Sequence, residues 1–186
     1  MAAALSKIEQ AKADLCGLEL EPQLAQLAST GWDNLDEATL TIRLKWLGIF
    51  FRPVTPGRFM VRLRLPNGVI QAEQLEVLAD AVDRCGEWGS ADITTRQNLQ
   101  LRGLLLEDMA PLLSAMQSVG LTSRQSGHDN PRNITGNPFA GLDPEELVDT
   151  RPLVDAIQRR LLADDAPTNL PRKFNIAVGG APDSFL

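Results

Sequence analysis

The stretch Asp92–Gly103, DITTRQNLQLRG, predicts a β-strand whose two faces differ in chemistry. Side chains alternate along a strand, so every second residue shares a face. One face is plainly apolar only towards its ends, at Ile93, Leu99 and Leu101, with Thr95 and Gln97 between them. The other face carries hydrogen-bonding groups throughout: Thr94, Arg96, Asn98, Gln100 and Arg102. Two guanidinium groups on one face require partners.

A second strand is predicted in RFMVRLRLPNG, residues 58–68, where Arg62 and Arg64 oppose an apolar row. A helix over Gln71–Cys85 separates the two strands, and another covers Glu107–Val119. This order of elements predicts the α+β class, with helices on one face of a sheet. Both arginine rows would then project from the other face.

The flanking segments predict two further parts. Residues 1–56 form a helical arm, with helices over 5–29, broken at Gly17 and Pro22, and over 36–47, followed by the extended GIFFRPVTPG. Residues 121–144 are rich in Gly, Pro, Asn and Ser and predict a long structureless loop. A helix in two pieces over 144–162 and a strand over 173–178 follow. Residues 183–186 end without a capping element, which indicates a fragment.

Composition excludes several function classes. The net charge of −6 and the pI near 4.8 argue against a general nucleic-acid binder. No apolar run is long enough to span a bilayer, so we expect a soluble intracellular protein without membrane contact. Cys16 and Cys85 have no CxxC spacing, and with the single His128 they cannot build a zinc site. Arginine outnumbers lysine, fourteen to four, although the chain is acidic.

Several arginines within reach of one another repel unless anions lie between them. Arg132 in the long loop and Arg172 beside Lys173 add to the two rows on the strands. Each guanidinium can form a bidentate bond to a carboxylate, which predicts a ligand with several carboxylates, a small oxyanion, or both. The alternative is a half-solvated sheet whose arginines only balance the chain's own Asp and Glu residues.

Four motifs together resemble one family: MVRLRLPNG, TTRQNLQLRG, SGHDNPRNITGNPFAG and NLPRKFNIAV. They are similar to the amino-terminal half of the ferredoxin-dependent nitrite reductases, within the nitrite/sulfite reductase family. The resemblance, from about residue 30 to the end, implies sirohaem, a macrocycle with eight carboxylates, coupled to a [4Fe-4S] cluster. It also implies that ferredoxin supplies electrons and that nitrite is reduced to ammonia.

The resemblance also assigns residues. It places Arg62, Arg132, Lys173 and Asn175 at the substrate anion as the catalytic set. It places six residues against sirohaem: Thr94, Arg96, Asn98, Gln100, Arg102 and Arg64. Sulfite reductases tend to carry lysine at the position of Asn175, so that residue favours nitrite. A sulfite reductase fragment, or a non-catalytic module that binds a tetrapyrrole or an anion, are the alternatives.

The family holds its cluster with four cysteines in its carboxy-terminal half, so Cys16 and Cys85 cannot ligate it, and the chain alone should be inactive. The expected parts are a helical N-terminal arm (1–56), a ferredoxin-like βαβ half-domain (57–124) and the beginning of a mixed α+β sirohaem-binding domain (125–186). The expected compartment is the cytoplasm or one similar to the plastid stroma.

Overall fold

The computed structural model describes residues 5–86, 89–164 and 166–182. Its α-helices are α1 (Lys7–Asp14), α2 (Leu24–Thr30), α3 (Glu37–Thr41), α4 (Ala72–Arg84), α5 (Met109–Ser118) and α6 (Arg151–Leu162). Its strands are β1 (Ile49–Phe51), β2 (Phe59–Arg62), β3 (Ala91–Thr94), β4 (Asn98–Leu104), β5 (Pro131–Gly136) and β6 (Phe174–Val178). Its 3-10 helices are η1 (Gly17–Gln23), η2 (Trp32–Asn34), η3 (Arg43–Leu47), η4 (Pro66–Gly68), η5 (Leu106–Asp108) and η6 (Ala166–Asn169). The predicted α+β class is confirmed. The prediction that residues 183–186 end without a capping element falls outside the described residues.

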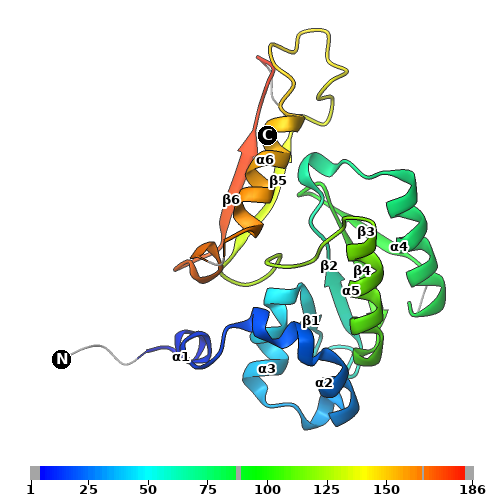
Figure 1. Ribbon diagram of the computed structural model, residues 1–186, viewed down its shortest axis with the longest axis vertical. Coiled ribbons are helices and arrows are strands. Elements are labelled where there is room, and N and C mark those ends of the chain that lie inside the picture. Colours follow the sequence, from blue (N-terminus) through cyan, green and yellow to red (C-terminus); the bar gives the residue numbers. More distant parts are fainter. Residues whose placement is uncertain (1–4, 87–88, 165, 183–186) are drawn as a thin grey trace.

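The central layer is an antiparallel sheet with strand order β1-β2-β4-β3. Helices α4 and α5 cover one face of it, as predicted (Figure 1). Phe59 and Val61 of β2 and Leu101 and Leu104 of β4 are fully buried in the core between the layers. The opposite faces of β2 and β4 carry the arginines, because side chains alternate along each strand.

The single strand predicted over 92–102 is wrong: the segment is a hairpin of β3 and β4 joined by Thr95–Gln97. A three-residue hairpin loop commonly ends in the left-handed conformation, and Gln97 adopts it with φ 51°. Thr94 is paired directly with Asn98 across the hairpin, so these two still share a face. Ile93, expected on the inner face, is 84% exposed on the edge strand.

A second unit consists of β5 and β6, which pair in parallel, with α6 connecting them as a crossover. Strand β5 lies inside the segment predicted to be structureless, so that prediction is wrong. Ile134 of β5 is fully buried and pairs with Ile176 of β6, which explains why a segment rich in polar residues becomes a strand. The helix expected from residue 144 begins only at Arg151.

The helical arm breaks near its predicted positions. Gly17 begins η1, and Pro22 lies within it, ahead of α2. The helix predicted over 36–47 divides into α3 and η3. Gly48, with φ 76°, caps η3 in the left-handed conformation and leads into β1.

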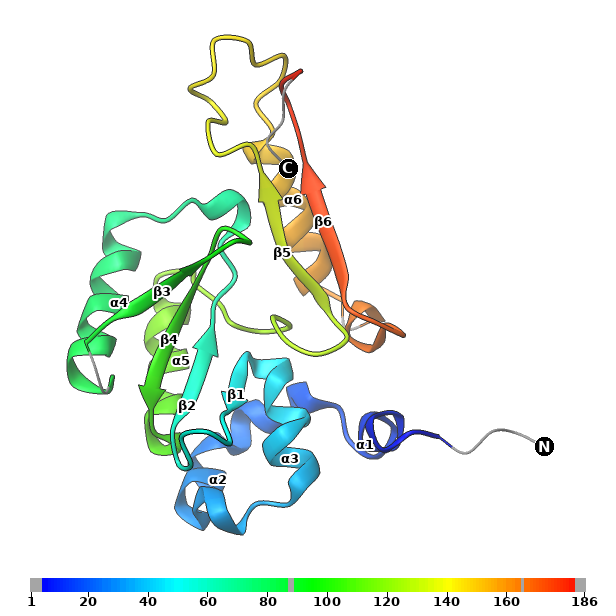
Figure 2. The ribbon, with the colours of Figure 1, turned by 180° about the vertical axis from the view of Figure 1, so that it is seen from behind.

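The side-chain amide of Asn133 joins the two sheets. Asn133 of β5 accepts a hydrogen bond from the backbone nitrogen of Leu65 (2.9 Å) and donates to the carbonyl oxygens of Leu65, Arg96 and Gln97. The end of β2 and the tip of the hairpin are thereby fixed to the second unit. Seen from behind, the strands of both sheets lie in front of their helices, so the two uncovered faces look to the same side of the molecule (Figure 2).

Candidate anion and cofactor site

The uncovered face of the central sheet brings the predicted polar residues together. Arg62 of β2 pairs across the sheet with Gln100 of β4, and Arg102 pairs with Met60. Asp92 of β3 lies opposite Gln100 on the other side. Arg102 forms an ion pair with Asp92, and its Nη2 donates to Gln100 Oε1 at 2.9 Å. The charge of Arg102 is therefore balanced by a carboxylate of the same sheet, as the alternative of a half-solvated sheet predicts.

Arg62 and Arg132 come from different sheets and meet at one carbonyl oxygen. Arg132 Nη1 lies 2.9 Å from the oxygen of Ser126, and Arg62 Nη1 lies 3.5 Å from the same atom. The guanidinium carbon of Arg62 also lies 4.4 Å from the ring centroid of Phe50, a cation–π distance. Among the described residues, neither arginine forms an ion pair with a carboxylate.

The pKa values record this crowding of positive charge. Burial, followed by the charges of Arg132, Arg96 and Arg102, lowers the pKa of Arg62 to about 10. Burial and the charge of Arg96 lower the pKa of Arg132, and Asp129 opposes them. Arg96 lies at the exposed tip of the hairpin, with no ion pair in the part of the chain that the structure describes. An anion placed among these groups would relieve their mutual repulsion.

A pocket of about 390 Å³ opens beside Arg62 and Arg132. Its walls come from η3, β1, β2, the segment that enters β5, and the segment that enters β6. The lining residues are Lys45, Phe50, Arg62, His128, Asp129, Arg132, Arg172 and Lys173. The pocket thus gathers three of the four predicted catalytic residues, whereas Asn175 is exposed on β6 and is not part of this lining.

Sequence reasoning missed two lining residues. Lys45 follows no recognisable motif on η3, and burial lowers its pKa. His128 comes from the loop before β5, and its ring stacks on Trp46 with 4.9 Å between centroids. Burial lowers the pKa of His128 although Asp129 opposes it, so the imidazole is neutral at pH 7.

Two predicted cofactor residues are engaged within the protein. Arg64 is 1% exposed, and its guanidinium donates to Gln158 Oε1 and to the carbonyl oxygens of Gln125, Pro131 and Arg132. Asn98 is buried and donates to the carbonyl oxygen of Leu63, while its own oxygen accepts from the Leu99 nitrogen. Both side chains fix the backbone beside the site through these hydrogen bonds. The alternation of residues along a strand could not predict this role.

Comparison with known proteins agrees with this architecture. Residues 53–119 match the nitrite/sulfite reductase ferredoxin-like half domain, and residues 127–186 match the nitrite and sulphite reductase 4Fe-4S domain. The chain belongs to the nitrite/sulfite reductase family. It is 55% identical, over 98% of its length, to the ferredoxin–nitrite reductase of Synechococcus elongatus. It is 44% identical, over 96% of its length, to the chloroplastic ferredoxin–nitrite reductase of spinach, Spinacia oleracea.

The chain spans about a third of those relatives, 36% of the first and 31% of the second, and corresponds to their amino-terminal portion. The structure of the NirA protein of Mycobacterium tuberculosis superimposes with a TM-score of 0.87 at 26% identity, covering 96% of this chain and 36% of that one. The dissimilatory sulfite reductase DsrI shares the fold with a TM-score of 0.56 over 67% of this chain and 29% of that one.

The residues of this cluster fit a cofactor that carries carboxylates. Arg62, Arg96 and Arg132 form a cationic cluster on the uncovered side with no ion pair among the described residues, as such a ligand requires. Within the described residues, no group of three or more His, Cys, Asp or Glu side chains could hold a metal ion. Cys16 and Cys85 are free thiols. No helix in the described part of the chain is long and apolar enough to cross a membrane.

Proposed function

We propose that this chain is the amino-terminal part of an enzyme that reduces nitrite to ammonia with electrons from ferredoxin, at sirohaem coupled to a [4Fe-4S] cluster. The observation that carries the proposal is the convergence of Arg62, Arg96 and Arg132, none of which has a carboxylate within ion-pair distance among the described residues. The names of the relatives supply the substrate and the electron donor.

The pocket residues bind and orient the substrate anion. Arg62 and Arg132 present charge-assisted donors to its oxygens, and Lys173 adds an ammonium from the start of β6. Charges that are already in place stabilise the negative charge that develops on an oxygen as it leaves. The fourth residue of the predicted catalytic set, Asn175, lies two residues beyond Lys173. We propose that Asn175 determines the preference of the enzyme for nitrite over sulfite.

The hairpin face holds the cofactor. Thr94, Arg96, Gln100 and Arg102 are the donors available to its carboxylates, and Arg102 would exchange Asp92 for a ligand carboxylate. Asn98 and Arg64 contribute by fixing the backbone under that face. When bound, sirohaem supplies the electrons to the substrate, and the protein supplies the orientation of the substrate and the electrostatic field around it.

Proton delivery belongs to lysine and not to arginine. Arginine stays charged under physiological conditions and is a poor acid, whereas an ammonium or a water ordered by it can donate. Lys173 and Lys45 line the pocket, and burial lowers the pKa of Lys45, which makes its ammonium a stronger acid than an exposed lysine.

We also propose the division into an arm (1–56), a ferredoxin-like half-domain (57–124) and the start of the sirohaem domain (125–186).

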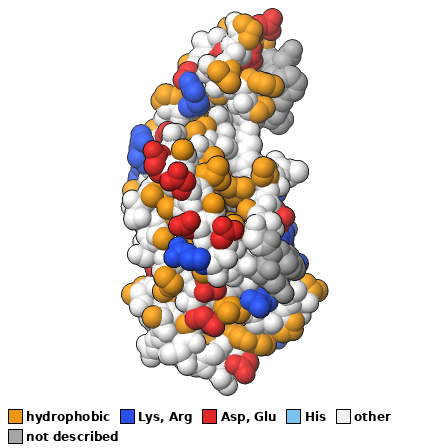
Figure 3. Space-filling view, turned by 90° about the vertical axis from the view of Figure 1, so that its right-hand side faces the viewer, with side chains coloured by type: hydrophobic (Ala, Val, Ile, Leu, Met, Phe, Trp, Pro, Cys, Tyr) orange, Lys and Arg blue, Asp and Glu red, His pale blue; other side chains and the backbone are white. Residues whose placement is uncertain are grey.

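Ferredoxin is acidic and requires a basic docking patch. On the α4 side of the molecule, Lys and Arg side chains stand singly among Asp and Glu (Figure 3). We therefore place the ferredoxin-docking surface on another face of this chain or on the rest of the enzyme. The proposed compartment is the cytoplasm or one similar to the plastid stroma.

The test uses the whole enzyme loaded with both cofactors. Reduced ferredoxin and nitrite should yield ammonium, and Arg132→Ala should reduce the rate by roughly tenfold or more because a charge-assisted contact to the anion is lost. Arg84→Ala, an exposed arginine of α4 with side-chain exposure of 73%, is the matched control and should leave the rate unchanged. Loaded enzyme that forms no ammonium from nitrite would refute the proposal.

A further inference from the structure

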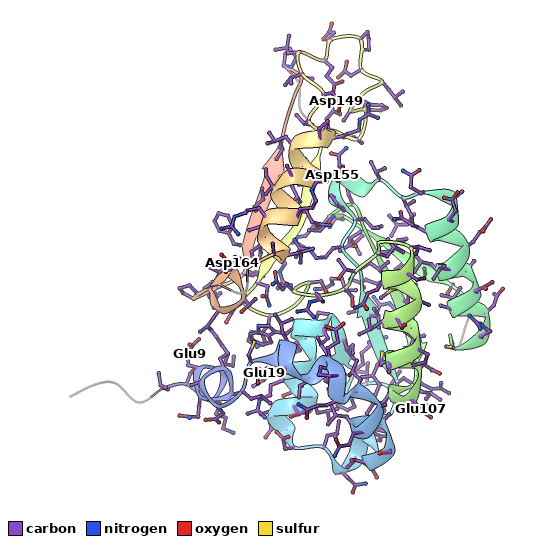
Figure 4. All side chains as sticks on the ribbon, in the orientation of Figure 1. Glu9, Glu19, Glu107, Asp149, Asp155 and Asp164 are labelled. Carbon is purple, nitrogen blue, oxygen red and sulfur yellow. The ribbon has the colours of Figure 1, made fainter. Side chains whose placement is uncertain are left out.

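Lys12 of α1 is a buried ammonium behind the pocket. Its side chain is 3% exposed, and Nζ lies 2.7 Å from Glu9 Oε1, 3.3 Å from Asp129 Oδ2 and 3.3 Å from the carbonyl oxygen of Leu170. The Leu170 nitrogen also donates to the Asp129 carbonyl at 3.1 Å. Figure 4 shows Glu9 on α1 on the same side of the molecule as Asp164, which follows α6. Lys12 thus joins two of the segments that line the pocket, those that lead into β5 and β6.

Asp129 is the one acidic side chain among the residues that line the pocket. Its carboxylate faces three cationic or titratable neighbours: Lys12 at 3.3 Å, His128 Nδ1 at 3.4 Å, and Arg132, whose pKa it raises. A carboxylate inside an anion pocket competes with the anion for the same guanidinium. The competition is limited here because, among the described residues, the Asp129 carboxylate lies within ion-pair distance of Lys12 and not of Arg132.

We propose that Lys12 is a positioning residue that restrains Asp129 and so keeps Arg132 available to the substrate anion. The inference rests on the proposed function of the pocket and assigns part of its anion affinity to the helical arm. Without Lys12, the Asp129 carboxylate would turn to Arg132, its strongest remaining partner, and lower the positive charge that the anion meets. Binding of the anion would weaken while the groups that contact it stayed in place.

The experiment compares Lys12→Met, Asp129→Asn and the double variant in the whole cofactor-loaded enzyme. Nitrite binding is measured by isothermal titration calorimetry, and turnover separates KM from kcat. Lys12→Met should raise the nitrite Kd and KM by about tenfold, with kcat nearly unchanged. The double variant should restore the wild-type Kd, because the competing carboxylate has gone. Lys7→Met, on the exposed start of the same helix, is the control and should change neither quantity.

Three outcomes decide between the explanations. An unchanged Kd in Lys12→Met overturns the inference. A raised Kd that Asp129→Asn fails to restore also overturns it, because Lys12 would then act only by supporting the fold. A raised and restored Kd in an enzyme that does not turn nitrite over supports the inference and refutes the proposed function instead.

Discussion

The side chain of Gln97 forms two hydrogen bonds with the backbone of Gly136: its Nε2 donates to the carbonyl oxygen at 2.7 Å, and its Oε1 accepts from the nitrogen at 2.9 Å. This pair fastens the tip of the β3–β4 hairpin to β5. Because Arg96 occupies the same tip, the position of its guanidinium relative to Arg132 depends on this contact. The left-handed conformation of Gln97, with φ 51°, is what turns its side chain out of the hairpin and towards β5.

Gln97→Ala should therefore destabilise the protein and loosen the site. Alanine keeps the β-carbon, so the backbone strain is unchanged and only the two hydrogen bonds are lost, at about 2 kcal/mol in the free energy of unfolding. Denaturant unfolding of the whole enzyme measures this. Gln26→Ala, on the exposed side of α2, should have no effect, and an equal loss in both variants would contradict the role of the contact.

Arg96→Ala should reduce the sirohaem content of the purified enzyme. The arginine is exposed and makes no ion pair within the described part of the chain, so its removal should not affect folding. Loss of one charge-assisted bond to a cofactor carboxylate weakens binding by about tenfold or more. Soret absorbance per mole of protein reports occupancy, and Arg84→Ala is the control. Full occupancy in Arg96→Ala would count against the hairpin as a cofactor contact.

Stability should fall in mild acid because of His128. Burial is the largest influence on its pKa and lowers it below 6.5; Asp129 raises it, and Lys45 and Lys12 lower it again. Since the unfolded chain binds the proton at higher pH than the folded protein, the free energy of unfolding decreases as the pH drops through 6.5 towards the folded-state pKa.

His128→Phe can keep the stacking on Trp46 without titrating. The variant should lose less stability than the wild type between pH 7.5 and pH 5, measured by denaturant unfolding at several pH values. Identical pH profiles for the two proteins would show that His128 is not the group responsible.

Elements with strong periodicity were predictable, whereas long-range contacts were not. Helix α4 lies at Ala72–Arg84 against a prediction of residues 71–85, and β6 lies within its predicted range. The hairpin was missed because its turn, Thr95–Gln97, lacks the Gly, Asn or Pro that marks most turns. Strand β5 was missed because its stability comes from a partner about forty residues away, at Ile134 and Ile176.

The same distinction holds for the site. The spacing of Arg62, Gln100 and Arg102 indicated their common face, and the resemblance added Arg132 and Lys173, which line the pocket together with Arg62. The sequence could not reveal that Arg64 is buried on backbone carbonyl oxygens, since its alternation matches that of Arg62. Nor could it reveal Lys12, which acts from a helix more than a hundred residues before Asp129.

Asn175→Lys should shift the preference of the enzyme from nitrite towards sulfite. Asn175 is exposed on β6, two residues beyond Lys173, so in extended backbone the two side chains share a face. A second ammonium there would favour the more highly charged sulfite over nitrite, changing the ratio of the two kcat/KM values by about tenfold. Asn169→Lys adds the same charge at an exposed position of η6 and should leave the ratio unchanged. If both variants shift the ratio equally, overall charge and not the position of Asn175 sets the preference, and the assignment of this residue to substrate choice is wrong.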